Sequence, residues 1–67
     1  MTMSLPNAPV ERIIRKAGAE RVSESAVEEL KQALEEAAEE ISQEASKMAD
    51  HAGRNTVTRE DIEISTQ

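Results

Sequence analysis

The fold of this chain follows from one stretch, SESAVEELKQALEEAAEEISQEASKMADHAG, residues 23–53. Its apolar side chains recur every three or four residues, at Val27, Leu30, Leu34, Ala37, Ile41, Ala45, Met48 and Ala52. On a helix these positions lie within about 45° of a single line. Ser23 is a favourable N-cap, and Gly53 is a favourable residue just beyond a helix end. The stretch therefore predicts one long amphipathic helix over residues 24–51.

The opposite side of this predicted helix is acidic. Seven glutamates lie between residues 28 and 44, where Lys31 is the one basic residue. Several of them are four residues apart, a spacing at which each like-charged pair destabilises a helix by roughly a few tenths of a kcal/mol. We interpret the acidic side as a solvated surface and expect no metal site there.

The length of the helix predicts an oligomer. It would extend about 42 Å, which is more than a globule of 67 residues requires. A chain this short buries only about 60% of the surface of its unfolded state. Cysteine is absent and the single histidine, His51, is too little for a zinc site. We therefore expect no metal or cofactor, and a dimer whose core contains Leu30, Leu34, Ala37 and Ile41.

A shorter helix is predicted before the long one, from about Pro9 to Ala17. Proline suits the first position of a helix, and Gly18 is suited to end it. The helical spacing marks a buried face composed of Val10, Ile13, Ile14 and Ala17.

Another short helix is predicted after Thr58. This threonine and Asp61 have the spacing of a capping box, with aspartate in place of glutamate. We expect the helix to bury Ile62, with Ile64 as a second candidate, and to end within residues 65–67. The connecting segments 20–22 and 55–57 each contain one β-branched residue, so each is a candidate for a very short strand.

The fold class expected from these elements is all-α, in the order short helix–loop–long helix–loop–short helix. Residues 1–67 are expected to form a single domain, with residues 1–7 as a short N-terminal segment. Charge is distributed unevenly over it: the net charge is −6, but residues 1–21 carry +2 and residues 22–50 carry −7. This asymmetry leaves a basic N-terminal part that can face an anionic partner.

Several classes of protein are excluded by what the sequence lacks. No apolar run approaches the roughly 20 residues of a membrane span, and the first residues do not resemble a signal peptide. We therefore expect a cytoplasmic protein without a membrane partner. With one histidine, no cysteine and no glycine-rich phosphate loop, the sequence offers no nucleophile–base pair, so we do not expect an enzyme.

Five short segments carry a resemblance to a known family. They are LPxAPV at 5–10, RII at 12–14, AGAERVS at 17–23, HAGRxTV at 51–57 and EDIE at 60–63. They closely resemble the archaeal histones, in a match that needs no gaps and covers essentially residues 5–64. The resemblance implies the histone fold and a head-to-tail "handshake" dimer in which the two long helices cross.

The resemblance also implies a surface for double-stranded DNA, built from the paired first helices and the two loops. Arg21 would enter the minor groove, whereas the other contacts would be made to the phosphate backbone. Asn55 and Thr58 stand where relatives commonly carry basic residues, which should weaken phosphate attraction. The implied DNA-binding residues are Arg12, Arg15, Lys16, Arg21, Arg54 and Thr56.

Two further sets of residues follow from the resemblance. Arg54 is expected to pair with Asp61 and so to pin the second loop to the third helix. Contacts between dimers are expected to form a four-helix bundle in which histidine and aspartate bond across the interface. That interface would contain Met48, His51, Asp61 and Ile64.

Two functions remain open on the sequence. The first is a histone that binds DNA non-specifically, wraps it and compacts it into chromatin, as a homodimer that can extend to tetramers or longer stacks. The second is an acidic interaction module with weak DNA affinity, which would act as a heterodimer partner or as a cap on histone assemblies. The retained arginines favour the first, and the net charge favours the second.

Overall fold

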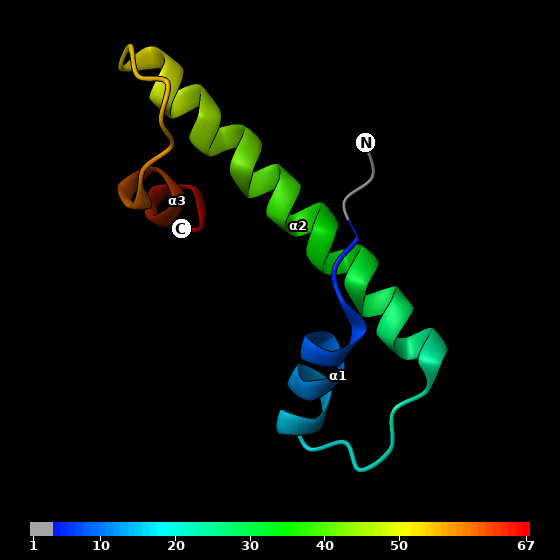
Figure 1. The fold of residues 1–67 in the computed structure, drawn as a ribbon. Coiled ribbons are helices and arrows are strands. Elements are labelled where there is room, and N and C mark those ends of the chain that lie inside the picture. Colours follow the sequence, from blue (N-terminus) through cyan, green and yellow to red (C-terminus); the bar gives the residue numbers. More distant parts are fainter. Residues whose placement is uncertain (1–3) are drawn as a thin grey trace. The chain divides into compact units, whose positions relative to one another are not determined.

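The computed structural model describes residues 4–67 as three helices joined by loops (Figure 1). They are α1 (Asn7–Lys16), α2 (Glu24–His51) and α3 (Arg59–Ser65). The predicted all-α order of short, long and short helices is confirmed, and α2 has the bounds expected from its apolar periodicity. None of the helices in the described part of the chain is long and apolar enough to cross a membrane.

Local capping bonds explain both ends of α2. The backbone N–H of Ala26 donates to the Ser23 hydroxyl at 3.1 Å, as expected of an N-cap. At the other end, the N–H groups of Gly53 and Arg54 each donate at 2.9 Å, to the carbonyls of Asp50 and Ala49. This is the Schellman arrangement, and it requires the positive φ of 71° that Gly53 adopts.

The start of α1 differs from the prediction. The helix begins at Asn7, with Pro6 as the N-cap, so Pro9 is the third helical residue rather than the first. Proline is tolerated throughout the first turn, because the N–H groups there have no acceptor within the helix. The expected N-terminal segment therefore ends before Asn7, and its residues 1–3 lie outside the described residues.

Contacts from α2 hold the chain at this point. The backbone N–H of Leu5 donates to a carboxylate oxygen of Glu35 at 3.2 Å. The ammonium group of Lys31 donates to the Asn7 side-chain oxygen at 3.0 Å. Glu35 and Lys31 thus anchor the segment that enters α1, and Glu35 is not simply part of a solvated acidic side.

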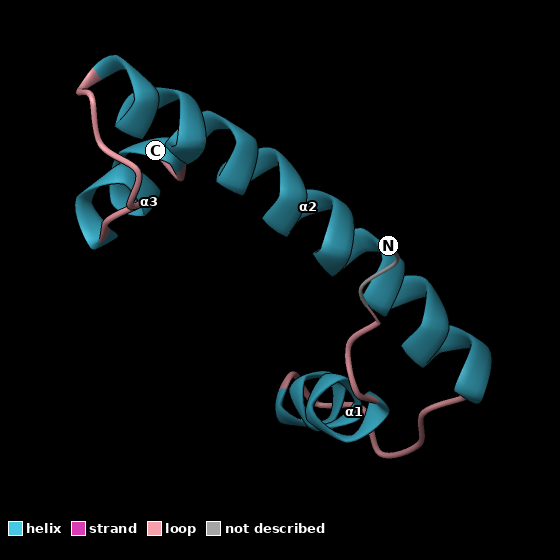
Figure 2. Ribbon diagram, turned by 45° about the horizontal axis from the view of Figure 1, so that its top comes forward, coloured by secondary structure: helices cyan, strands magenta, loops and turns pink. Residues whose placement is uncertain are grey.

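The predicted short strands are absent from residues 4–67, where all segments between helices are loops (Figure 2). Residues 20–22 and 55–57 have no strand partner within residues 4–67. A strand of three residues makes few hydrogen bonds and needs a neighbouring strand to complete it.

Little apolar surface is buried within the chain. The residues group into two compact units, one containing α1 with α2 up to Glu36 and one comprising Ala37–Gln67. The buried apolar side chains of residues 4–67 are small: Val10 and Val27 in the first unit, Ala45 and Ala49 in the second. The described core contains no large side chain that is completely buried.

Several predicted core residues are exposed. In α1, Val10 is buried and Ile14 is partly buried, but Ile13 and Ala17 are exposed. In α3, the predicted burial of Ile62 and Ile64 is wrong for the single chain, because they remain 37% and 54% exposed. Helix α3 has only seven residues, so only one of its sides is covered by the rest of the chain. Asp61 and Ser65, one turn apart, lie on that side.

Candidate nucleic-acid interface

Three basic side chains of the N-terminal unit face solvent. Arg12 and Lys16 lie on α1, and Arg21 lies in the loop between α1 and α2. All three are exposed, and within residues 4–67 none of them forms an ion pair or a side-chain hydrogen bond. Their charges are therefore available to an anionic ligand, and sequence-independent attraction to DNA phosphates needs no more than such charges.

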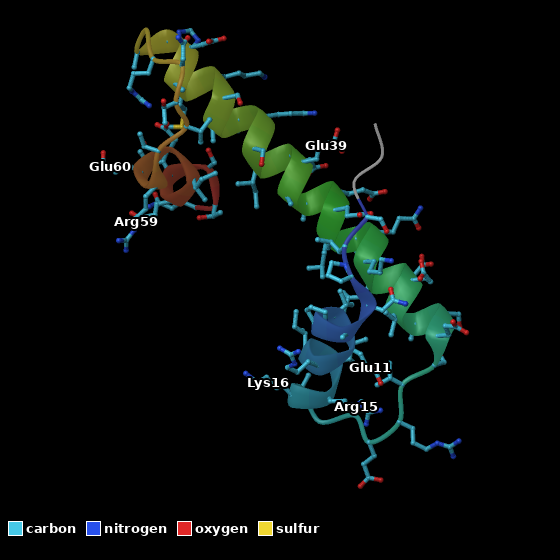
Figure 3. The ribbon with its side chains drawn as sticks, in the orientation of Figure 1. Glu11, Arg15, Lys16, Glu39, Arg59 and Glu60 are labelled. Atoms are coloured by element: carbon cyan, nitrogen blue, oxygen red, sulfur yellow. The ribbon has the colours of Figure 1, made fainter. Side chains whose placement is uncertain are left out.

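Arg15 is different, because its guanidinium group is already engaged. Nη2 and Nε donate to the Glu11 carboxylate at 2.9 and 3.3 Å, and Nη1 donates to the backbone carbonyl of Glu20 at 2.9 Å. Figure 3 shows Glu11 and Arg15 on the side of α1 that faces the following loop, whereas Lys16 points elsewhere. The resemblance implies that Arg15 contacts phosphate; in the structure its guanidinium group bonds to its own chain, although 51% of the side chain remains exposed.

The second loop is held by a buried carboxylate. Arg54 donates two hydrogen bonds to Asp61, Nη1 to Oδ2 at 2.9 Å and Nη2 to Oδ1 at 3.0 Å. Its Nη1 also donates to the backbone carbonyl of Thr56 at 2.9 Å. Asp61 is only 3% exposed, although it carries a charge. A bidentate arginine–carboxylate pair has a defined geometry, so it fixes the loop relative to α3.

The same aspartate also caps α3. The backbone N–H of Thr58 donates to Asp61 Oδ2 at 2.9 Å, and the N–H of Asp61 donates to the Thr58 hydroxyl at 3.4 Å. These two bonds form the capping box. The Arg54 guanidinium and, next, the Thr58 N–H hold the pKa of Asp61 well below its ordinary value. The bond to Asp61 in turn raises the pKa of Arg54.

Arg54 is therefore less available to DNA than the free basic residues. Its side chain is 38% exposed, but its charge is compensated by a carboxylate in direct contact. Thr56 is exposed in the same loop, and its backbone carbonyl, not its hydroxyl, receives the bond from Arg54. The structure thus brings together the predicted loop-pinning pair, Arg54 and Asp61, and adds the Thr56 carbonyl as a further acceptor for Arg54.

The residues expected at the interface between dimers form no hydrogen bond or ion pair with one another within residues 4–67. They are Met48, His51, Asp61 and Ile64. Asp61 is engaged as described, whereas His51 is exposed at the last position of α2. The Ser65 hydroxyl lies 3.6 Å from the sulfur of Met48, which is partly buried. Ile64 is among the most exposed large apolar residues of the described chain.

The expected dimer core is incompletely covered. Leu30, Leu34 and Ile41 are only partly buried on α2, and Ala37 is exposed. Apolar positions on a continuous helix face that the chain's own helices leave uncovered indicate where a second chain can pack.

Sequence reasoning missed two features of the charged surface. Arg59 and Glu63 form an exposed ion pair at 2.7 Å on α3, and Glu11 pairs with Arg15 on α1. The signal for both was in the sequence, since each pair has the four-residue spacing that brings side chains together on a helix.

Comparison with known proteins defines the class. A family model described as "Histone-like transcription factor (CBF/NF-Y) and archaeal histone" matches residues 3–65. The chain is 52% identical over 63 residues to one of the subunits of archaeal histone HAN1 from Thermococcus zilligii, with 94% of each chain covered. It is 51% identical over 61 residues to probable archaeal histone 3 of Methanocaldococcus jannaschii, with 91% of each chain covered.

These matches and the three-helix fold define a histone-fold protein. The chain belongs to the archaeal histone family, whose members are dimer-forming, DNA-binding chromatin proteins and not enzymes.

Proposed function

We propose that two copies of this chain form a handshake dimer that holds double-stranded DNA non-specifically, wraps it and compacts it in the nucleoid. Family membership over residues 3–65 carries the proposal. The free basic groups of the N-terminal unit support it. Arg12 and Lys16 would contact phosphates from α1, and Arg21 would enter the minor groove. Thr56 would meet the backbone from the second loop.

A dimer is favoured by the poor burial within one chain. The partly exposed Leu30, Leu34 and Ile41, together with Ala37, would form the shared core along the crossed α2 helices. Each square ångström of apolar surface removed from water contributes about 25 cal/mol. The 67-residue chain has no disulfide to stabilise it in another way.

We test the DNA surface with Arg21→Ala and a matched control, Lys47→Ala. Both variants remove one positive charge from an exposed side chain, but Lys47 lies on α2 outside the proposed surface. Binding to a duplex of random sequence would be measured by fluorescence anisotropy at several salt concentrations. Arg21→Ala should weaken binding, and the slope of log K against log salt should become shallower by about two per dimer, one for each copy of Arg21. Equal effects of the two variants would show that the surface is misassigned.

A second function, an acidic interaction module, is favoured by the charges of the chain. The net charge is −6, and Arg15, Arg54 and Arg59 are each paired with a carboxylate. Such a chain would bind DNA weakly alone and act as a heterodimer partner or a cap. Titration with and without a more basic histone-fold protein separates the two functions. Binding seen only in the mixture would favour the module, whereas binding by the chain alone would favour the histone.

A further inference from the structure

We propose that Arg15 is a positioning residue, which fixes the loop from which Arg21 projects, and not a phosphate contact. The proposal rests on the DNA-binding role proposed above for Arg21. It assigns different tasks to two arginines of α1, since Arg12 has no side-chain partner within residues 4–67, whereas the guanidinium group of Arg15 is held by Glu11 and by the Glu20 carbonyl.

The side chain of Arg15 connects α1 to the end of the following loop. One edge of the guanidinium group bonds to Glu11, four residues earlier on the same helix, and Nη1 bonds to the Glu20 carbonyl. The carboxylate keeps the guanidinium from rotating, and the planar fork directs the remaining N–H groups along fixed lines. Figure 3 shows the labelled pair against the loop.

The backbone of Arg15 takes part in the same turn. Its carbonyl accepts the N–H of Gly18 at 3.0 Å, and the carbonyl of Ile14 accepts the N–H of Ala19 at 3.4 Å. This Schellman arrangement turns the chain out of α1 through a positive φ at Gly18. The bond to Glu20 then holds the chain again immediately before the next residue, Arg21, so the loop is fixed at two points.

Fixing the Glu20 carbonyl has a direct effect on Arg21. The carbonyl of one residue and the N–H of the next belong to one planar peptide unit. A bond that sets the direction of the Glu20 carbonyl therefore also sets the plane from which Arg21 begins. A loop ordered before DNA arrives loses less conformational entropy on binding.

The second loop supplies an independent parallel. There, Arg54 lies between the Asp61 carboxylate and the Thr56 backbone carbonyl. Arg15 lies in the same way between a carboxylate of α1 and a backbone carbonyl of the first loop. In both loops an arginine is held by a carboxylate and in turn holds a loop carbonyl, so both perform a structural task with a side chain that could otherwise bind phosphate.

The test compares Arg15→Lys with the matched control Arg12→Lys. Both substitutions keep the positive charge, but lysine cannot bond Glu11 and the Glu20 carbonyl with a planar fork. We expect lower NMR order parameters for residues 19–22 in DNA-free Arg15→Lys, and unchanged values in Arg12→Lys. DNA affinity should fall about two- to fivefold for Arg15→Lys, the size expected of an exposed ion pair, with an unchanged salt slope. Unchanged order in residues 19–22 would overturn the proposal.

Glu11→Ala gives a second, independent test of the role of Arg15. If Arg15 is a positioning residue, releasing it from Glu11 should lower the same order parameters. If Arg15 is instead a masked phosphate contact, its release should steepen the salt slope by about two per dimer, one for each copy, and this result would overturn the proposal. The order parameters are measured without DNA, whereas the DNA surface is tested by Arg21→Ala, so failure of one proposal is distinguishable from failure of the other.

Discussion

At the scale of single residues, Asp61 is the one buried polar or charged side chain among residues 4–67. Asp61 accepts two bonds from Arg54 and one from the Thr58 N–H, so the ionised form is stabilised although the residue is 3% exposed. A buried charge is tolerated only when it is paired and hydrogen-bonded. Asp61 therefore links the second loop and the start of α3 through a single side chain.

The pKa of Asp61 predicts a specific acid sensitivity. Its pKa is lowered in the folded chain, chiefly by the Arg54 bond, and is about 3.9 in an unfolded chain. Ionised Asp61 thus stabilises the fold above about pH 4, and this contribution is lost as the pH falls towards the lowered pKa. We expect the difference in Tm between the parent and Asp61→Asn to be constant near neutral pH and to shrink below about pH 4.

The measurement is thermal unfolding by circular dichroism at one protein concentration, because the Tm of an oligomer depends on concentration. Comparing the two proteins at each pH cancels the effect of protonating the many glutamates, which both share. A difference in Tm that persisted unchanged to about pH 2 would contradict the assigned role of Asp61.

At the scale of elements, α3 depends on its cap because it has only seven residues. Thr58→Ala removes the hydroxyl that accepts the Asp61 N–H and should destabilise the protein by about 1 kcal/mol. Thr58→Ser keeps a hydroxyl at the same place and should retain most of the stability. Urea unfolding curves of the three proteins give the comparison. Equal midpoints for Thr58→Ala and the parent would show that the 3.4 Å contact contributes nothing.

The acidic side of α2 predicts that added salt raises the Tm of the protein. Glu36 and Glu40 are like charges four residues apart, and the nearby Lys31 is occupied by Asn7 and Glu28. Added salt screens this repulsion and leaves apolar burial intact. We expect the Tm to rise between low salt and about 1 M KCl, and to rise less in Glu36→Gln/Glu40→Gln. A flat or falling Tm in the parent would refute the prediction.

At the scale of the whole molecule, a single chain leaves much of its apolar surface uncovered. Its buried apolar side chains within residues 4–67 are two valines and two alanines, while Ile13, Ile62 and Ile64 remain exposed. A second chain along α2 and further contacts near α3 would cover such residues. The proposed dimer thus follows from the same sequence that leaves a single chain poorly packed.

We propose that stacking between dimers uses His51 with Asp61 of a neighbouring dimer, beside Met48 and Ile64. Asp61 is 3% exposed and already accepts two bonds from Arg54 and one from the Thr58 N–H, but its Oδ1 carries only one of these bonds and can accept another. DNA should promote the contact by raising the effective concentration of dimers. Crosslinking should give larger species with DNA than without it, and His51→Ala should reduce them. A variant that stacks on DNA like the parent would place the junction elsewhere.

The helices and their caps could be predicted from the amino-acid sequence alone. The periodicity of α2, its ends at Ser23 and Gly53, and the Thr58–Asp61 capping box all depend on residues within one or two turns of each other. Such features follow from local interactions alone, namely the spacing of side chains along a helix and the backbone bonds at its ends. The loop pair of Arg54 and Asp61 was expected from segments that resemble a known family.

Only the tertiary structure shows which basic side chains are bonded within the chain and which are free, because this depends on how separate segments pack. Glu11 and Arg15 have a helical spacing in the sequence, but the bond to the Glu20 carbonyl depends on the path of the loop after α1. The anchoring of Leu5 by Glu35 likewise joins residues thirty positions apart. Periodicity gives the direction of a side chain about its own helix, whereas its partner is set by how distant segments come together, and that determines which arginines are left for DNA.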